Sequence, residues 1–149
     1  MERMYRKGLF KHLLLMLLTM TFLTGCVLPN EKAYYADSNH YIRSDAVVEN
    51  IIYDEGDKEI VFWLQELDEA YVTSSFIIRG RSAELLLEND VFDKIKIGDT
   101  ITFTSAPRIF GNGHFFPIVQ LAVSGDELLS FEEGHQNLLA EYPAFGILY

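Results

Sequence analysis

One stretch of the chain gathers the side chains that a ligand-binding loop uses. It runs from Arg108 to Phe116 and holds a guanidinium, an imidazole, three phenylalanines and two glycines. Aromatic rings can stack on a sugar or on a peptide, while polar groups orient the ligand through hydrogen bonds. The candidate ligand-binding residues are Arg108, Asn112, His114, Phe115 and Phe116.

The same stretch also has a purely structural interpretation. Asn112-Gly113 is the strongest short signal for a hairpin turn, and phenylalanines are mostly core residues. In this interpretation, which residue statistics favour, the glycines serve the turn and the phenylalanines point inward. The burial of the phenylalanine side chains distinguishes the two interpretations.

A different chemistry is expected at Cys26, the only cysteine of the chain. It follows a basic N-terminal segment and an apolar run from Leu13 to Phe22. A basic segment, roughly 7–15 apolar residues and a site of small residues form the layout of a secretory signal peptide. The run is too short to span a bilayer comfortably, which takes about 20 residues. The alternatives are an uncleaved membrane helix and a buried free cysteine.

The residues Leu23-Thr24-Gly25-Cys26 resemble the lipobox of bacterial lipoproteins. In that family the cysteine thiol takes a diacylglycerol, and a dedicated peptidase cuts before the cysteine. The resemblance implies that residues 1–25 are a signal peptide and that Cys26 is the lipid attachment site. It also implies a chain held at the extracytoplasmic face of the cell membrane, or at an outer membrane where one exists. Two acyl chains anchor stably where one is marginal.

The net charge of the expected mature chain limits the classes of partner that it can bind. Residues 26–149 contain 8 Lys and Arg against 21 Asp and Glu, a net charge of −13. Such a domain repels nucleic-acid phosphates, so nucleic acid is not an expected partner. With a single cysteine, the mature chain has no intrachain disulfide, and its fold depends on an apolar core.

Turn signals without periodicity predict that residues 26–44 are a lipidated N-terminus and tether. Tyr34, Tyr35 and Tyr41 are unusual in a free linker, and they either pack back on the domain or lie near the lipid headgroups. Residues 45–149 are expected to form one globular domain.

Apolar alternation in that domain predicts five strands, with a helix between the third and the fourth. Ser82 is a suitable N-cap for that helix, Trp63 is expected in the core, and Gly134 is a weak point in a C-terminal helix. The expected strands cover residues 46–53, 59–67, 71–79, 100–105 and 115–123, and the expected helices cover 83–89 and 132–142. This order resembles the OB-fold, a five-stranded partly open barrel. The predicted class is therefore mainly β (α+β), with a small β-sandwich as the alternative.

Other candidate sites are weaker. Asp54, Glu55 and Asp57 share one turn that can hold Ca²⁺, but they lack the spacing of an EF-hand loop, so a solvated turn is favoured. The histidines show no metal-binding spacing, and no nucleophile elbow or phosphate-binding glycine loop is present. The sequence therefore indicates no catalytic residue, metal or cofactor.

We expect a lipid-anchored, extracytoplasmic binding or accessory module of the bacterial envelope, which is not an enzyme. Its ligand would be an envelope protein, a peptide or a glycan. The alternatives are a small envelope hydrolase that uses carboxylates and a cation-binding lipoprotein.

Overall fold

The structure is a computed structural model, and it describes residues 31–110 and 114–142. The contacts within the chain divide it into two units, Met1–Asn30 and Glu31–Tyr149. The fold and the site described below belong to this second unit.

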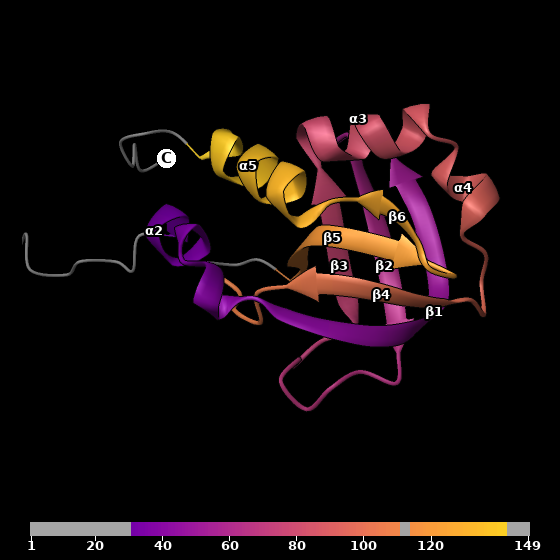
Figure 1. Cartoon of the computed structure of the whole chain (residues 1–149), viewed down its shortest axis with the longest axis horizontal. Coiled ribbons are helices and arrows are strands. Elements are labelled where there is room, and N and C mark those ends of the chain that lie inside the picture. The colour runs from indigo at the N-terminus through magenta and orange to yellow at the C-terminus, as the bar shows by residue number, and fades with distance from the viewer. Residues whose placement is uncertain (1–30, 111–113, 143–149) are drawn as a thin grey trace, which may run out of the picture. The chain divides into compact units, whose positions relative to one another are not determined.

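Within the described residues, six strands form one sheet. They are β1 (Ile42–Asp54), β2 (Glu59–Gln65), β3 (Ser75–Arg79), β4 (Thr100–Ser105), β5 (Phe116–Val123) and β6 (Asp126–Leu129). Their order is β3-β2-β1-β4-β5-β6, and a parallel pairing of β3 with β5 closes the first five strands into a barrel (Figure 1). The predicted OB-like barrel is confirmed, and the short β6 extends it beyond β5.

Strand β2 illustrates why these residues form a barrel. Its side chains alternate between the inside and the outside, with Ile60, Phe62 and Leu64 essentially fully buried. Four phenylalanines fill the centre of the barrel, and they are Phe62, Phe76, Phe103 and Phe116. The rings of Phe76 and Phe103 meet edge to face with centroids 5.0 Å apart, a favourable geometry for aromatic pairs.

Two helices follow β3, α3 (Gly80–Glu88) and α4 (Val91–Lys94), and they lie over one end of the barrel (Figure 1). Helix α3 begins earlier than predicted, so Ser82 is a helix residue and the predicted N-cap is wrong. The Ser82 hydroxyl is buried and accepts a hydrogen bond of 3.1 Å from Asn137 Nδ2. It therefore connects two helices instead of capping one.

The predicted C-terminal helix is α5 (Phe131–Glu141), and Ser130 is its N-cap, accepting a hydrogen bond from the Glu133 N–H. The helix packs on β5 at Val119, between the residues of β5 that pair with β3 and those that pair with β6. Gly134 is buried against the Val119 main chain, and a Cβ there would collide with the Val119 carbonyl oxygen. Gly134 therefore permits a close approach of helix and strand, which helix propensity alone did not indicate.

The N-terminal part of the unit is folded where the sequence predicted a tether. Helix α2 (Glu31–Ala36) and the 3-10 turn η1 (Ser38–His40) precede β1. The predicted tether is thus wrong for residues 31–44, because Tyr35 is buried together with Leu138 of α5. The interpretation that the tyrosines pack back on the domain is confirmed.

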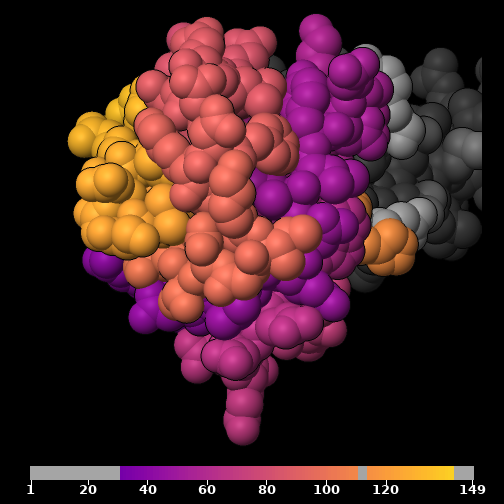
Figure 2. All heavy atoms as spheres, turned by 90° about the vertical axis from the view of Figure 1, so that its right-hand side faces the viewer, coloured from indigo at the N-terminus to yellow at the C-terminus, as the bar shows by residue number. Residues whose placement is uncertain are grey.

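The connection between β2 and β3, residues 66–74, projects from the barrel in both views (Figures 1 and 2). It carries Val72, which is 85% exposed. The loop is attached at its base, where Ser44 Oγ donates a hydrogen bond of 3.2 Å to Asp68 Oδ2.

Candidate functional site

The candidate binding residues that the sequence predicted at the β4–β5 connection differ in how deeply their side chains are buried. Arg108 and His114 are exposed, Phe115 is half-buried, and Asn112 lies outside the described residues, as does Cys26. Phe116 is fully buried inside the barrel, where its ring lies 5.5 Å from that of Phe76. Its prediction as a ligand-binding residue is therefore wrong, because it starts β5 with its side chain pointing inward.

Arg108 connects this loop to the N-terminal helix. Its guanidinium carbon lies 5.1 Å from the ring centroid of Tyr34 and 4.7 Å from that of Phe110. Both distances fall within the range of a cation–π interaction. Tyr34 also stacks on His40, with centroids 4.0 Å apart and an interplanar angle of 12°. The loop, α2 and η1 therefore form one aromatic cluster.

The buried residue Tyr35 of α2 connects this loop to the N-terminal segment through hydrogen bonds. Its hydroxyl donates to the Arg108 carbonyl at 3.2 Å, and its own carbonyl accepts a 2.9 Å hydrogen bond from the Tyr41 hydroxyl. That carbonyl also lies 2.6 Å from His135 Nε2 of α5. Burial raises the pKa of Tyr35 and of Tyr41, so both hydroxyls stay protonated as donors.

A cavity of about 60 Å³ opens where α2, the β4–β5 connection and α5 meet. Its walls are mainly aromatic and aliphatic, with one carboxylate and one guanidinium. The lining residues are Glu31, Tyr35, Arg79, Ile109, Phe110, Phe115, Pro117, Leu138 and Tyr142. The Tyr142 hydroxyl donates to Glu31 Oε1 at 3.0 Å, which fixes that carboxylate at the wall. The volume suits a few water molecules or one small chemical group.

Arg79 lies between this cavity and two carboxylates. Its Nε is 3.9 Å from Glu59 Oε2 and 3.8 Å from Glu141 Oε2. Burial raises the pKa of both carboxyls, and the charge of Arg79 opposes that shift. The cavity beside Glu141 measures about 10 Å³, roughly enough for one water. The cluster therefore has the geometry of an ion-pair network that shapes one wall of the larger cavity.

Several residues of the site were not identified from the sequence. Phe110 belongs to the predicted loop but was not singled out, and the unusual tyrosines gave a signal for Tyr34, Tyr35 and Tyr41 but not for Tyr142. Arg79 and Glu31 reach the cavity from elements far apart in the chain. Only the closure of the barrel and the packing of α2 bring them together.

The remaining predictions have separate outcomes. The Asp54 carboxylate accepts hydrogen bonds from the Gly56 and Asp57 N–H groups, as expected of a solvated turn. Trp63 is half-buried on the outside of the barrel, so its prediction as a core residue is wrong. In residues 31–110 and 114–142, no three His, Cys, Asp or Glu side chains are grouped to hold a metal ion. Among the helices of the described part, none has the length and hydropathy needed to cross a membrane.

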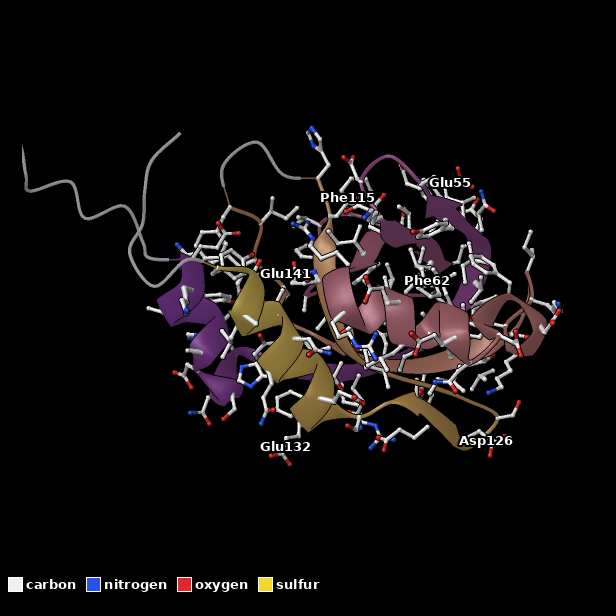
Figure 3. The ribbon with its side chains drawn as sticks, turned by 90° about the horizontal axis from the view of Figure 1, so that it is seen from above. Glu55, Phe62, Phe115, Asp126, Glu132 and Glu141 are labelled. Atoms are coloured by element: carbon white, nitrogen blue, oxygen red, sulfur yellow. The ribbon has the colours of Figure 1, made fainter. Side chains whose placement is uncertain are left out.

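The cavity, the cation–π cluster and the ion-pair network together define the candidate site, and Figure 3 shows Phe115 and Glu141 in relation to the barrel. Comparisons of the chain with protein-family models, with curated proteins and with solved structures found no match.

Proposed function

We propose that the protein is a lipid-anchored, extracytoplasmic binding module of the bacterial envelope, and that the aromatic cavity is its binding site. One observation carries the proposal: the loop that the sequence singled out meets both terminal helices around a cavity. Concave, mostly apolar sites with a few fixed polar groups are typical of binding sites. Here Glu31 and Arg79 supply the polar groups, and Phe110 and Phe115 supply aromatic surface.

The lipid anchor would place this cavity near the membrane. Lipidation of Cys26 leaves five peptide units to Glu31, which span at most roughly 18 Å when extended. Glu31 is part of the cavity wall. A ligand presented close to the bilayer surface, such as the extracytoplasmic part of a membrane protein, fits this arrangement.

The carboxylates of the site support binding more than hydrolysis. A glycoside hydrolase needs two carboxyl groups on either side of a bound substrate. Glu59 and Glu141 contact the same guanidinium, and the cavity at Glu141 has room for about one water. We therefore assign these two carboxylates to the ion-pair network that holds Arg79, which itself lines the binding site.

Photo-cross-linking in intact cells tests the binding site. p-Benzoyl-phenylalanine replaces Phe115 in one variant and Ile97, which is 68% exposed, in a control variant. We expect a discrete cross-linked product from position 115 and none of the same mass from position 97. The same products from both positions, or no product at position 115, would contradict the assignment of the cavity.

Cell fractionation tests the anchor independently. Cys26→Ser removes the thiol that would carry the lipid, so the protein is expected to leave the membrane fraction. Mass spectrometry of the unaltered protein is expected to show a diacylated N-terminal cysteine. An unmodified Cys26 would refute the anchor without affecting the test of the cavity.

A further inference from the structure

Four aromatic rings of the described residues line the cavity, and they belong to Tyr35, Phe110, Phe115 and Tyr142. The ring centroids of Tyr35 and Phe110 are 5.5 Å apart with an interplanar angle of 67°. Those of Tyr35 and Tyr142 are 5.7 Å apart with an angle of 34°. Because these rings are not parallel, they form adjoining walls of the cavity instead of a flat stack.

Hydrogen bonds and helix packing hold these walls in place. Helices α2 and α5 lie side by side at one end of the barrel (Figures 1 and 3). The Tyr142 hydroxyl donates to Glu31 Oε1 of α2, which connects the end of α5 to α2. The Tyr35 hydroxyl donates to the Arg108 carbonyl, which connects α2 to the loop. The walls are therefore formed before a ligand binds, and preorganisation lowers the cost of binding.

The cavity wall has a carboxylate available to a positively charged ligand. In residues 31–110 and 114–142, no lysine, arginine or histidine forms an ion pair with Glu31. Burial and the charge of Glu31 both raise the pKa of Tyr142, so the hydroxyl remains a donor to that carboxylate. The other charged lining residue, Arg79, lies within 4 Å of both Glu59 and Glu141, which offset its charge. The wall therefore favours a cation.

Two further cations lie near the cavity but are not part of its lining. Lys32 Nζ donates to the Tyr142 carbonyl at 2.9 Å, and the Arg108 guanidinium lies over the rings of Tyr34 and Phe110. Arg108 is exposed, so water and salt screen its charge. Its position over two rings is itself an example of the attraction that aromatic faces exert on a cation.

The size and the polarity of the cavity specify the kind of cation. One water needs roughly 10–15 Å³ of such volume, so about 60 Å³ has room for roughly four to six water-sized atoms. A trimethylammonium head with the methylene carbon attached to it has this size. A primary ammonium brings three N–H donors that need acceptors, whereas Glu31 is the one carboxylate in the lining. A quaternary ammonium has no N–H group and leaves no donor unpaired.

We propose that the cavity is an aromatic cage for a quaternary ammonium head such as that of choline, with Glu31 as its counter-charge. This inference rests on the proposed function and specifies the ligand of the same site. Aromatic cages bind such heads through the negative faces of the rings. The head belongs either to a free solute or to a lipid headgroup, and the chemistry of recognition is the same. The net charge of −13 on residues 26–149 disfavours anionic headgroups.

Isothermal titration calorimetry tests the inference, with the full-length lipoprotein in micelles of the uncharged detergent dodecyl maltoside. Choline is compared with 3,3-dimethylbutanol, which has the same shape but a neutral carbon in place of the nitrogen. We expect choline to bind at least about tenfold more tightly, because a desolvated cation–π contact contributes that much. Ethanolamine, whose primary ammonium keeps its N–H donors, is expected to bind more weakly than choline.

Two pairs of variants separate the cage from general effects. Glu31→Gln removes the charge and keeps an acceptor oxygen for Tyr142, whereas Glu69→Gln removes a charge from an exposed position between β2 and β3. Phe115→Leu removes one ring of the cage, whereas Phe92→Leu removes a half-buried ring of α4 that does not line the cavity. We expect Glu31→Gln and Phe115→Leu to weaken choline binding roughly tenfold and their controls to leave it unchanged. Circular dichroism verifies the fold of each variant.

Glycerophosphocholine identifies the source of the head. Tighter binding of glycerophosphocholine than of choline would support the cage and indicate a lipid headgroup, and equal or weaker binding would support the cage and indicate a free solute.

Several results would overturn the inference. They are equal affinity for choline and 3,3-dimethylbutanol, ethanolamine binding as tightly as choline, no binding of choline at millimolar concentration, or unchanged affinity in Glu31→Gln or Phe115→Leu. The proposed function depends instead on cross-linking at position 115. A discrete cross-linked product there, without binding of choline, would retain the binding site and refute the quaternary ammonium ligand.

Discussion

Gly134→Ala tests how α5 is attached to the barrel, because helix propensity and packing predict opposite signs. Alanine is favoured over glycine within a helix by roughly 1 kcal/mol, so propensity alone predicts stabilisation. The added methyl group, however, meets the Val119 carbonyl oxygen and lies 2.7 Å from the carbonyl carbon. These are main-chain atoms of β5, so no side-chain rotation relieves the collision.

The helix must therefore move away from β5, and residues on its inner face, such as Leu138, lose contacts. Overpacking of this kind costs typically about 1–3 kcal/mol, occasionally more. Because main-chain atoms cannot rotate away, we place the cost in the upper part of this range, about 2–3 kcal/mol, and the propensity gain of about 1 kcal/mol leaves an expected net loss of about 1–2 kcal/mol in the free energy of unfolding. For a domain of this size the loss corresponds to roughly 4 °C in Tm per kcal/mol.

Urea denaturation measures this change, followed by circular dichroism and by the fluorescence of Trp63, the only tryptophan. Ala140→Gly is the matched control, because Ala140 is an exposed residue of the same helix. It is expected to lose at most about 1 kcal/mol from propensity alone. A Gly134→Ala variant as stable as the unaltered protein, or more stable, would refute the close packing of α5 on β5.

Two further predictions concern the charged groups of the site. Arg108→Ala removes both cation–π contacts and is expected to cost about 0.5–1 kcal/mol in urea denaturation, the range for exposed pairs; no loss would show that the contacts contribute nothing. Burial raises the pKa of Glu141 in the folded state above its ordinary 4.5. Its protonated form therefore adds to the free energy of unfolding below pH 4.5, and this contribution is lost as pH rises through the folded pKa. Glu141→Gln should flatten this decline, and an unchanged profile in Glu141→Gln would contradict the partial burial of its side chain, which is 26% exposed.

The barrel was predictable because its strands alternate in hydrophobicity with period two. Strand β2 shows this period, since Ile60, Phe62 and Leu64 share one face and are all essentially fully buried. A strand that buries one face specifies its own register, so sequence pattern and structure agree there.

Helix α2 was not predictable by the same reasoning. It has six residues, too few to be stable alone in water. Its stability comes from distant contacts, such as the hydrogen bond of 2.9 Å from Lys32 Nζ to the Tyr142 carbonyl. Tyrosines in an apparent linker were the only local indication of such contacts.

The candidate loop was predicted in its position but not in the orientation of each side chain. Phe115 and Phe116 are chemically identical, and the sequence cannot tell which of them faces the barrel interior. The structure places Phe116 opposite Phe76 in β3, and alternation then turns Phe115 outward. A shift of one residue in that pairing would exchange the two roles.

The division of roles between these two residues connects the stability of the domain to its binding site. Fully buried Phe116 stabilises the barrel, and its replacement by alanine is expected to cost about 3–5 kcal/mol. Phe115 lies half-buried at the cavity, so it contributes less to stability and remains available to a ligand. The parallel pairing of β3 with β5 both closes the barrel and orients Phe115. The element that completes the fold therefore also positions the aromatic residue on which the proposed binding site depends.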